Sequence, residues 1–248
     1  MELNYGLQLF SISDFTAADL DYALANVAEY GYKTVEFAGF CGHTADEIDA
    51  MLKKYKLGVI GEHVGMDLLD EEHINSTLAS SEAIGNKNIV FPSLALSDAN
   101  EVAAALKNIE RIKKETDKRG MKLHFHTHDW DYRPNEDGLI PIEIIEKETD
   151  ILFEIDTFWA FYAGRDPVKE MERLRHRCEL VHIKDGKANR DPAVVGEGVA
   201  PVIECVEKAD ELGIYKIVES EGMIPDGLTD VRHCLKYLRK VANGEITR

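Results

Sequence analysis

The sequence predicts a (β/α)8 barrel, and three observations carry this prediction. Short apolar, β-branched segments alternate with amphipathic segments along all 248 residues, as strands and helices do in repeated βα units. Eight segments of each kind recur with a period of about thirty residues, the arrangement of an α/β barrel. Several helical segments also end in glycine, and a lysine and the next strand follow within a few residues.

The expected elements follow one another without a linker or a low-complexity segment, so residues 1–248 are treated as one domain. Strands are expected at 5–10, 34–37, 58–64, 88–91, 122–127, 151–156, 180–184 and 215–219. Helices are expected at 17–30, 45–55, 72–84, 101–119, 142–148, 167–175, 199–212 and 228–241.

Residues with known preferences for helix ends support these boundaries. Glycine favours the left-handed conformation that ends a helix, and it is expected in that role at Gly31, Gly85, Gly120 and Gly213. Thr44 is expected to cap the helix at 45–55. Proline is favoured in the first turn of a helix, and Pro167 follows Asp166 there.

A doubly wound open sheet is the alternative fold. It would more often have fewer strands and a Gly-x-Gly-x-x-Gly loop after the first one. Phe10-Ser-Ile-Ser-Asp stands there instead, so no dinucleotide-binding motif is present. No Walker-type phosphate loop occurs either.

The composition excludes some partners. The chain has 29 Lys and Arg against 46 Asp and Glu, a net charge of -17, which repels phosphate backbones and anionic membranes. We therefore expect no nucleic acid and no membrane as partner. The four cysteines are widely spaced, and residues 1–6 lack a signal-peptide pattern. Reduced, mostly buried thiols in a cytoplasmic protein are expected.

The segment Lys122–Trp130 carries histidine at every second position. Alternate side chains of a strand share one face, so His124, His126 and His128 are expected to point the same way. Imidazole is the commonest metal-binding side chain. Taken alone, this pattern fits a set of metal ligands and a structural polar layer equally well.

Polar residues at other strand ends favour the metal site. The C-terminal ends of barrel strands form the active site in this fold, and four late strands end in His126, Asp156, His182 and Glu219. Each has an ordinary alternative: Asp156 can cap a turn, His182 can be a core histidine and Glu219 can pair with lysine. Two imidazoles and two carboxylates converging on one mouth suit a divalent Mn, Co, Fe or Zn ion.

These residues also resemble a known family. Asp156-Thr-Phe-Trp, His182-Ile-Lys-Asp, Gly196-Glu-Gly and Ile217-Val-Glu are similar to motifs of the xylose isomerase-like barrel superfamily. Within it, the chain resembles the sugar phosphate isomerase/epimerase family, with hydroxypyruvate isomerase, ketose 3-epimerases and inosose dehydratase as relatives. The resemblance covers essentially the whole chain. It implies one divalent ion, with manganese favoured and magnesium also allowed, and matches Asp156, His182 and Glu219 to three of four ligands.

The sequence departs from that pattern at two places. His126 stands where the ketose epimerases have a glutamate that also moves protons, as in the His-x-His branch that includes inosose dehydratase. Relatives similar to endonuclease IV have a histidine where Trp159 stands, and a further histidine where Phe91-Pro-Ser ends the fourth strand. A DNA-repair nuclease is therefore not expected.

The favoured function is a metal-dependent sugar isomerase or epimerase that acts on a ketose, keto-sugar or related polyol through an enediolate. A divalent ion polarises a carbonyl and a neighbouring hydroxyl, which acidifies the C–H between them. Glu219 is the first candidate for proton transfer, and His126 is also expected to be a catalytic residue. Lys184 is expected to stabilise the oxyanion, or else to form an ion pair with Asp156 or Glu221.

Five residues are expected to contact a small carbohydrate substrate: Glu36, His63, His128, Trp130 and Trp159. His128 is also the rival base, with an acid limb expected near pH 6 to 7, the usual range of imidazole. The alternatives for the tryptophans and for Glu36 and His63 are ordinary packing and support of other site residues. Below the ligands, His124 and Glu154 are expected to approach each other.

Two other functions stay open. A lyase or dehydratase that eliminates from a keto-sugar, keto-glycoside or inosose shares the enediolate, and His126 in place of glutamate favours it. A non-catalytic sugar-binding barrel is the second alternative. Association into a homo-oligomer is also open. The loop Gly196-Glu197-Gly198 lies where some barrels bind phosphate, but its glutamate argues against an anion.

Overall fold

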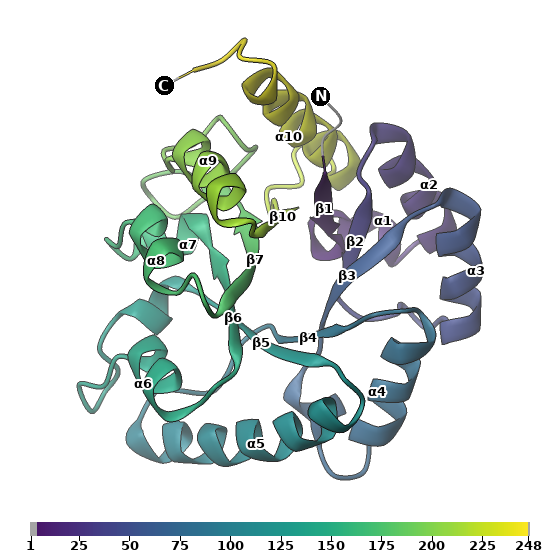
Figure 1. Cartoon of the computed structure of the whole chain (residues 1–248). Helices are drawn as coiled ribbons and strands as arrows, with labels where there is room; N and C mark the ends of the chain where they lie inside the picture. The colour runs from purple at the N-terminus through teal and green to yellow at the C-terminus, as the bar shows by residue number, and fades with distance from the viewer. Residues whose placement is uncertain (1–3, 248) are drawn as a thin grey trace.

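The computed structural model describes residues 4–247, and within them eight parallel strands close into a barrel (Figure 1). Each strand pairs with the next along the chain, and β10 closes the ring between β7 and β1. The predicted (β/α)8 barrel is therefore confirmed. The strands are β1 Tyr5–Gln8, β2 Thr34–Phe37, β3 Gly58–His63, β4 Asn88–Phe91, β5 Lys122–His126, β6 Leu152–Asp156, β7 Cys178–Ile183 and β10 Tyr215–Val218.

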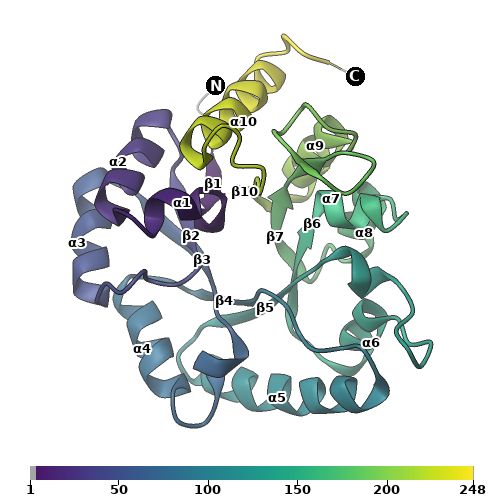
Figure 2. The same cartoon turned by 180° about the vertical axis from the view of Figure 1, so that it is seen from behind.

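Helices surround the barrel on all sides, and α10 packs beside α2, so the last helix meets the first large one (Figures 1 and 2). The helices are α1 Ser13–Thr16, α2 Leu20–Tyr30, α3 Ala45–Tyr55, α4 Ile74–Ala83, α5 Ala99–Lys118, α6 Pro141–Glu148, α7 Thr157–Tyr162, α8 Pro167–Arg173, α9 Val202–Leu212 and α10 Gly227–Ala242.

The predicted capping residues are confirmed, whereas the helices expected from residues 17 and 199 begin at Leu20 and Val202. Thr44 accepts from the backbone N–H of Glu47, whose side chain accepts from the N–H of Thr44, so α3 begins with a capping box. Gly31 and Gly213 end α2 and α9 in the left-handed conformation, which costs glycine nothing because it lacks a Cβ. Asp166 caps α8 and Pro167 opens it.

The main differences lie in the loops that follow the strands at the barrel mouth. The first strand ends at Gln8 instead of residue 10, because a 3-10 turn, Leu9–Ile12, follows at once. Similar short turns, Met66–Leu69 and Asp129–Tyr132, follow β3 and β5. After β7 comes a small antiparallel hairpin, β8 Asp185–Gly186 with β9 Pro192–Ala193.

The apolar core has two parts. The larger part fills the space between the strands and the surrounding helices. The smaller part lies inside the barrel, where Val90, Leu180 and Ile217 are buried and Ile60 and Tyr215 pack against them. Polar residues occupy the barrel interior above this layer, toward the C-terminal ends of the strands.

Other expectations about the chain are met only in part. Three cysteines are buried free thiols as expected, whereas Cys41 is exposed. Among the described residues, no helix combines the length and apolar character that crossing a membrane requires. Residues 1–3 and 248 lie outside the description, and so do the predicted ends of the domain and part of the segment judged to lack a signal peptide.

Candidate active site at the barrel mouth

The four predicted ligands come together at the ends of β5, β6, β7 and β10. His126, Asp156, His182 and Glu219 each offer one ligand atom, and these atoms all lie within 4.8 Å of one another. The strand register explains the grouping, because Asp156 and His182 are partners across β6 and β7. All four are buried, with Glu219 4% exposed and Asp156 fully enclosed.

Two members of this cluster, His182 and Glu219, form a close pair of opposite charge type. His182 Nδ1 lies 3.1 Å from Glu219 Oε2. Burial lowers the pKa of His182, but the carboxylates of Glu154 and Glu219 outweigh burial and raise it well above its ordinary value. Burial likewise raises the pKa of Glu219, but Lys184 and His182 outweigh it and hold that pKa well below its ordinary value.

The other two members have only longer contacts with charged groups: Asp156 Oδ2 lies 3.7 Å from Lys184 Nζ, and His126 Nδ1 lies 3.4 Å from Glu154 Oε2. Asp156 Oδ2 and His126 Nδ1 are buried without a hydrogen-bond partner among the described residues, a costly arrangement for a polar atom. Burial raises the pKa of Asp156 to about 7 and lowers that of His126 well below its ordinary value. A cation between them would supply the missing partner, so the donor set fits a divalent ion.

A second group of metal-competent atoms shares His126 and His182 and adds His63 and Glu154. His63 Nε2 lies 2.8 Å from Glu154 Oε2, and the His63 and His182 rings stack at 5.5 Å. Glu36, predicted to contact substrate, is fully buried here and bonds His182 Nε2 at 2.7 Å. A second group of buried carboxylates and imidazoles therefore lies beside the predicted ligands.

The expected meeting of His124 and Glu154 is not what the structure shows. Both side chains are buried inside the barrel, but the register pairs Glu154 with His126 and His124 with Leu152. His124 Nε2 instead bonds Asn88 Oδ1 at 3.0 Å. The stagger between barrel strands moves neighbouring residues out of line, and the sequence does not display this shift.

Lys184 lies among three carboxylates. Its Nζ is 2.9 Å from both Glu219 and Glu221 and 3.7 Å from Asp156. The ion-pair alternative is therefore confirmed. The side chain is only 1% exposed, so the ammonium is enclosed within this network and holds the two glutamates in place.

A pocket of about 380 Å³ opens above the cluster, within the usual range for small-molecule sites. Three predicted contact residues, His63, His128 and Trp130, line it. His128 stacks on Trp130 with ring centroids 4.4 Å apart, and Trp130 is 45% exposed. Trp159 is buried, and Lys184 lies over its ring, so Trp159 supports the wall from behind.

An ion pair between Arg190 and Asp129 lies at the mouth and is not predicted from the sequence. Arg190 Nη2 lies 2.9 Å from Asp129 Oδ1, and its guanidinium lies over the rings of Trp159 and Trp130 at 4.7 and 5.7 Å. This contact ties the loop of the β8–β9 hairpin to the segment after β5. Arg190 lies in an irregular loop, where no periodicity marks a residue for attention.

The glycine loop after β7 is already filled by a carboxylate. The backbone N–H groups of Gly196 and Gly198 donate to Asp185 Oδ2 at 3.0 and 2.8 Å, and Ala200 donates to Asp185 Oδ1 at 3.0 Å. These are the donors that would bind a phosphate in such a loop. Asp185 therefore takes the place of an external anion.

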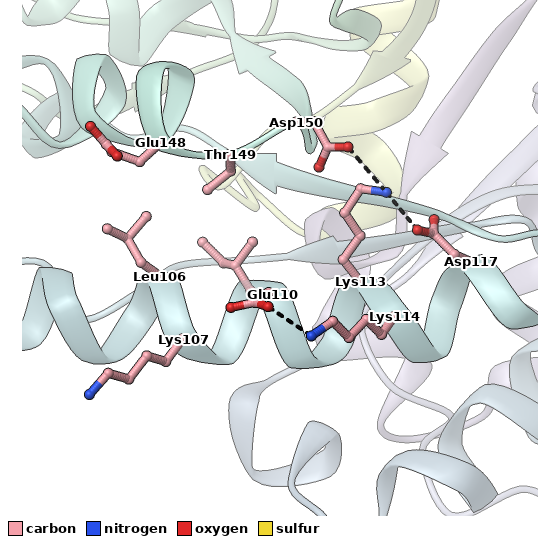
Figure 3. Close-up of a pocket in the computed structure, with 10 residues that line it drawn as sticks. Leu106, Lys107, Glu110, Lys113, Lys114, Asp117, Glu148, Thr149 and Asp150 are labelled. Carbon is pink, nitrogen blue, oxygen red and sulfur yellow. Dashed lines mark hydrogen bonds and ion pairs between the residues drawn. The ribbon is translucent and has the colours of Figure 1, made fainter.

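A separate hollow lies between α5 and the turn before β6 (Figure 3). Its charged groups neutralise one another, since Lys113 pairs with Asp117 and Asp150, and Lys114 pairs with Glu110. It borders the N-terminal end of β6, opposite the mouth, where barrel residues serve stability. This hollow therefore lies apart from the cluster at the mouth.

Comparison with known proteins agrees with this architecture. The chain belongs to the xylose isomerase-like TIM barrel family, whose model matches residues 24–241. No curated protein matches the sequence. The predicted recognition of the family is confirmed, whereas the assignment to its His-x-His branch stays a prediction.

Solved structures share the fold at low sequence identity. A sugar phosphate isomerase/epimerase from Parabacteroides distasonis is 22% identical, with a TM-score of 0.83 and coverage of 96% of this chain and 98% of that one. The probable 3-DHS dehydratase involved in petrobactin synthesis from Bacillus anthracis is 15% identical, with a TM-score of 0.75 and coverage of 96% and 99%. An L-ribulose 3-epimerase is 14% identical, with a TM-score of 0.75 and coverage of 97% and 94%.

Proposed function

We propose that this protein is a divalent-metal-dependent isomerase or epimerase of an unphosphorylated ketose or keto-sugar. The observation that carries the proposal is the buried cluster of His126, Asp156, His182 and Glu219 beneath a pocket at the barrel mouth. When bound there, a divalent ion such as manganese would polarise a carbonyl and its neighbouring hydroxyl. The structural relatives named as epimerases support this reading.

Glu219 is the residue best placed to move the proton. It lines the pocket, and Lys184 and His182 favour its carboxylate form by lowering its pKa, so it can accept a proton from the carbon next to a carbonyl and return it elsewhere. Lys184 keeps Glu219 in position through the 2.9 Å contact. His128 is the rival base, because it faces the same pocket, and burial keeps it neutral by lowering its pKa to about 4.

A neutral substrate follows from the charges at the mouth. Lys184 and Arg190 are both paired with carboxylates, and Asp185 occupies the glycine loop. Glu219 and Glu221 line the pocket itself. A phosphate group would therefore meet repulsion and find its usual donors occupied, whereas sugar hydroxyls suit a pocket lined by imidazoles and carboxylates.

A dehydratase or lyase is the second candidate, and one observation favours it. His126, not a carboxylate, stands at the end of β5, so that strand end supplies no carboxylate base. The likeness to a probable 3-DHS dehydratase agrees with this alternative.

Proton NMR in deuterated water separates the two candidates. The protein, loaded with manganese and then exchanged to magnesium to avoid paramagnetic broadening, is incubated with a panel of ketoses, keto-sugars and inososes. Exchange at one carbon without loss of water or a leaving group supports the isomerase or epimerase. Elimination products support the lyase, and neither exchange nor elimination with any compound would count against both.

A further inference from the structure

A second hollow adjoins the active-site pocket on the other side of Trp130. Its volume is about 490 Å³, and the segment after β4 together with the segment after β5 forms its walls. Trp130 lines both pockets, and residues 92–93 line the first pocket while residues 94–97 line the second. The two hollows are therefore neighbouring compartments of one mouth.

Most polar groups of this hollow already form hydrogen bonds, either between its two walls or within one wall. Asn135 Nδ2 donates to Leu96 O at 3.0 Å, and the backbone N–H of Glu136 donates to Ser97 O at 3.0 Å. Glu101 accepts from both the backbone N–H and the hydroxyl of Ser97. The walls are therefore fixed to each other before any ligand binds, which lowers the ordering cost of binding.

The groups left facing the hollow are mainly apolar. Leu94, Ala95, Pro134 and Pro141 contribute carbon surface, and Trp130 contributes an exposed ring. Arg133 is the one cation of the lining, and it already contacts Asp129 at 3.4 Å and the carbonyl of Tyr162 at 3.2 Å.

The charge of the lining argues against a phosphate or another anion. Glu101 and Glu136 outnumber Arg133 among the charged residues of the lining. A second sugar ring would need hydroxyl partners, and most of them are occupied. An apolar ring, in contrast, gains from carbon surface and from stacking on tryptophan.

We propose that this hollow is a second subsite that receives an apolar or aromatic ring attached to the sugar in the first pocket. The substrate is then a glycoside-like compound, with the reacting sugar below His128 and its apolar substituent beyond Trp130. This inference rests on the proposed function and adds the substrate class. The two compartments share Trp130 as a common wall.

Paired ligands test the subsite. We would measure binding of 4-nitrophenyl and methyl 3-ketoglycosides of glucose, galactose and xylose, which keep a carbonyl on the sugar. Calorimetry and quenching of tryptophan fluorescence, which two residues provide, measure the binding. For at least one sugar, the nitrophenyl compound should bind about tenfold tighter or better, because burying a ring contributes more than 1.4 kcal/mol.

Ala95→Phe fills the hollow from an exposed loop position and should reduce this preference to about twofold or less. Ala50→Phe, at an exposed position on α3, is the matched control and should keep it. Equal binding of the paired glycosides, absence of nitrophenyl binding, or an unchanged preference in Ala95→Phe would overturn the subsite. A ring preference without deuterium exchange in any sugar would instead overturn the proposed function alone.

Discussion

The two ends of the barrel interior are built from opposite kinds of side chain. Val90, Leu180 and Ile217 form a buried apolar layer, in which Leu180 and Ile217 each lie two residues before a predicted ligand, His182 or Glu219. Toward the C-terminal ends, the interior holds carboxylates and imidazoles, several without exposure to solvent. Both layers come from inward-facing positions of the same strands. Leu180 and His182, for example, lie two residues apart on β7.

This difference separates stability from function within one strand. Burying Leu180 removes apolar surface from water and stabilises the fold. Burying Asp156 and His126, in contrast, leaves polar atoms without hydrogen-bond partners among residues 4–247 and costs free energy. Proteins tolerate the cost of such buried polar groups mainly at functional sites. We therefore expect changes at the lower layer to affect folding and changes at the upper layer to affect chemistry.

The largest expected effect is on turnover, from the upper layer. Glu219→Gln keeps the side-chain shape and removes the basic carboxylate, so turnover should fall by about two to four orders of magnitude, the scale of a general base. At saturating manganese the site should still be occupied, since His126, Asp156 and His182 persist. Steady-state kinetics and metal analysis on one verified substrate measure both quantities.

The control for this change is His128→Asn at the other side of the pocket. If His128→Asn abolishes solvent-deuterium exchange and Glu219→Gln does not, the two roles are reversed. The acid limb expected from His128 near pH 6 to 7 also needs correction. Burial and the nearby Lys184 lower its pKa to about 4, so a limb due to His128 belongs near pH 4 and should vanish in His128→Asn.

At the lower layer, Leu180→Ala should act on stability instead. Leu180 is 2% exposed, and truncating such a leucine to alanine typically costs 2–5 kcal/mol of unfolding free energy, about that amount being expected here. Denaturant unfolding measures the loss. Turnover of the remaining folded protein should stay within about threefold of the parent, and a hundredfold loss would show that the two layers are not separable.

A smaller effect is expected at Asp131, a buried carboxylate outside the cluster. Its Oδ1 lacks a partner among the described residues, and burial raises its pKa to about 8, against about 3.9 in an unfolded chain. Between these values the folded state binds a proton that the unfolded state releases. The contribution of Asp131 to stability therefore falls as pH rises from about 4 to 8.

Asp131→Asn should remove this dependence. The amide oxygen can still accept from the backbone N–H of His128, as Asp131 does at 2.7 Å. The variant should melt above the parent at pH 8, with each kcal/mol worth on the order of 3 °C for a chain of this size, and the difference should disappear near pH 4. A constant difference across that range would assign the effect to something other than proton binding.

The sequence predicted the barrel because its signals are local. The expected strands at 34–37 and 88–91 match β2 and β4, and the expected helix at 45–55 matches α3, where a capping box fixes the start. The predicted ligands meet because the ends of parallel strands meet at one rim, which is a property of the fold.

The remaining features depend on long-range geometry. His124 bonds Asn88 and not Glu154 because the strands are staggered, and no local pattern reports stagger. The hairpin β8–β9 and Arg190 lie in a loop shaped by its contacts with Asp129. Asp185 filling the glycine loop was also hidden, because its partners lie 11–15 residues downstream.

The central claim is that the upper layer exists to hold a divalent ion, and metal binding by paired variants tests it most directly. Manganese titration of chelator-treated protein should give one site in the parent, and Asp156→Asn should weaken it by about tenfold to a hundredfold or more, since it removes a charged ligand. Leu180→Ala should bind manganese as the parent does. If Asp156→Asn retains one tightly bound equivalent after dialysis, the assignment of this cluster is contradicted.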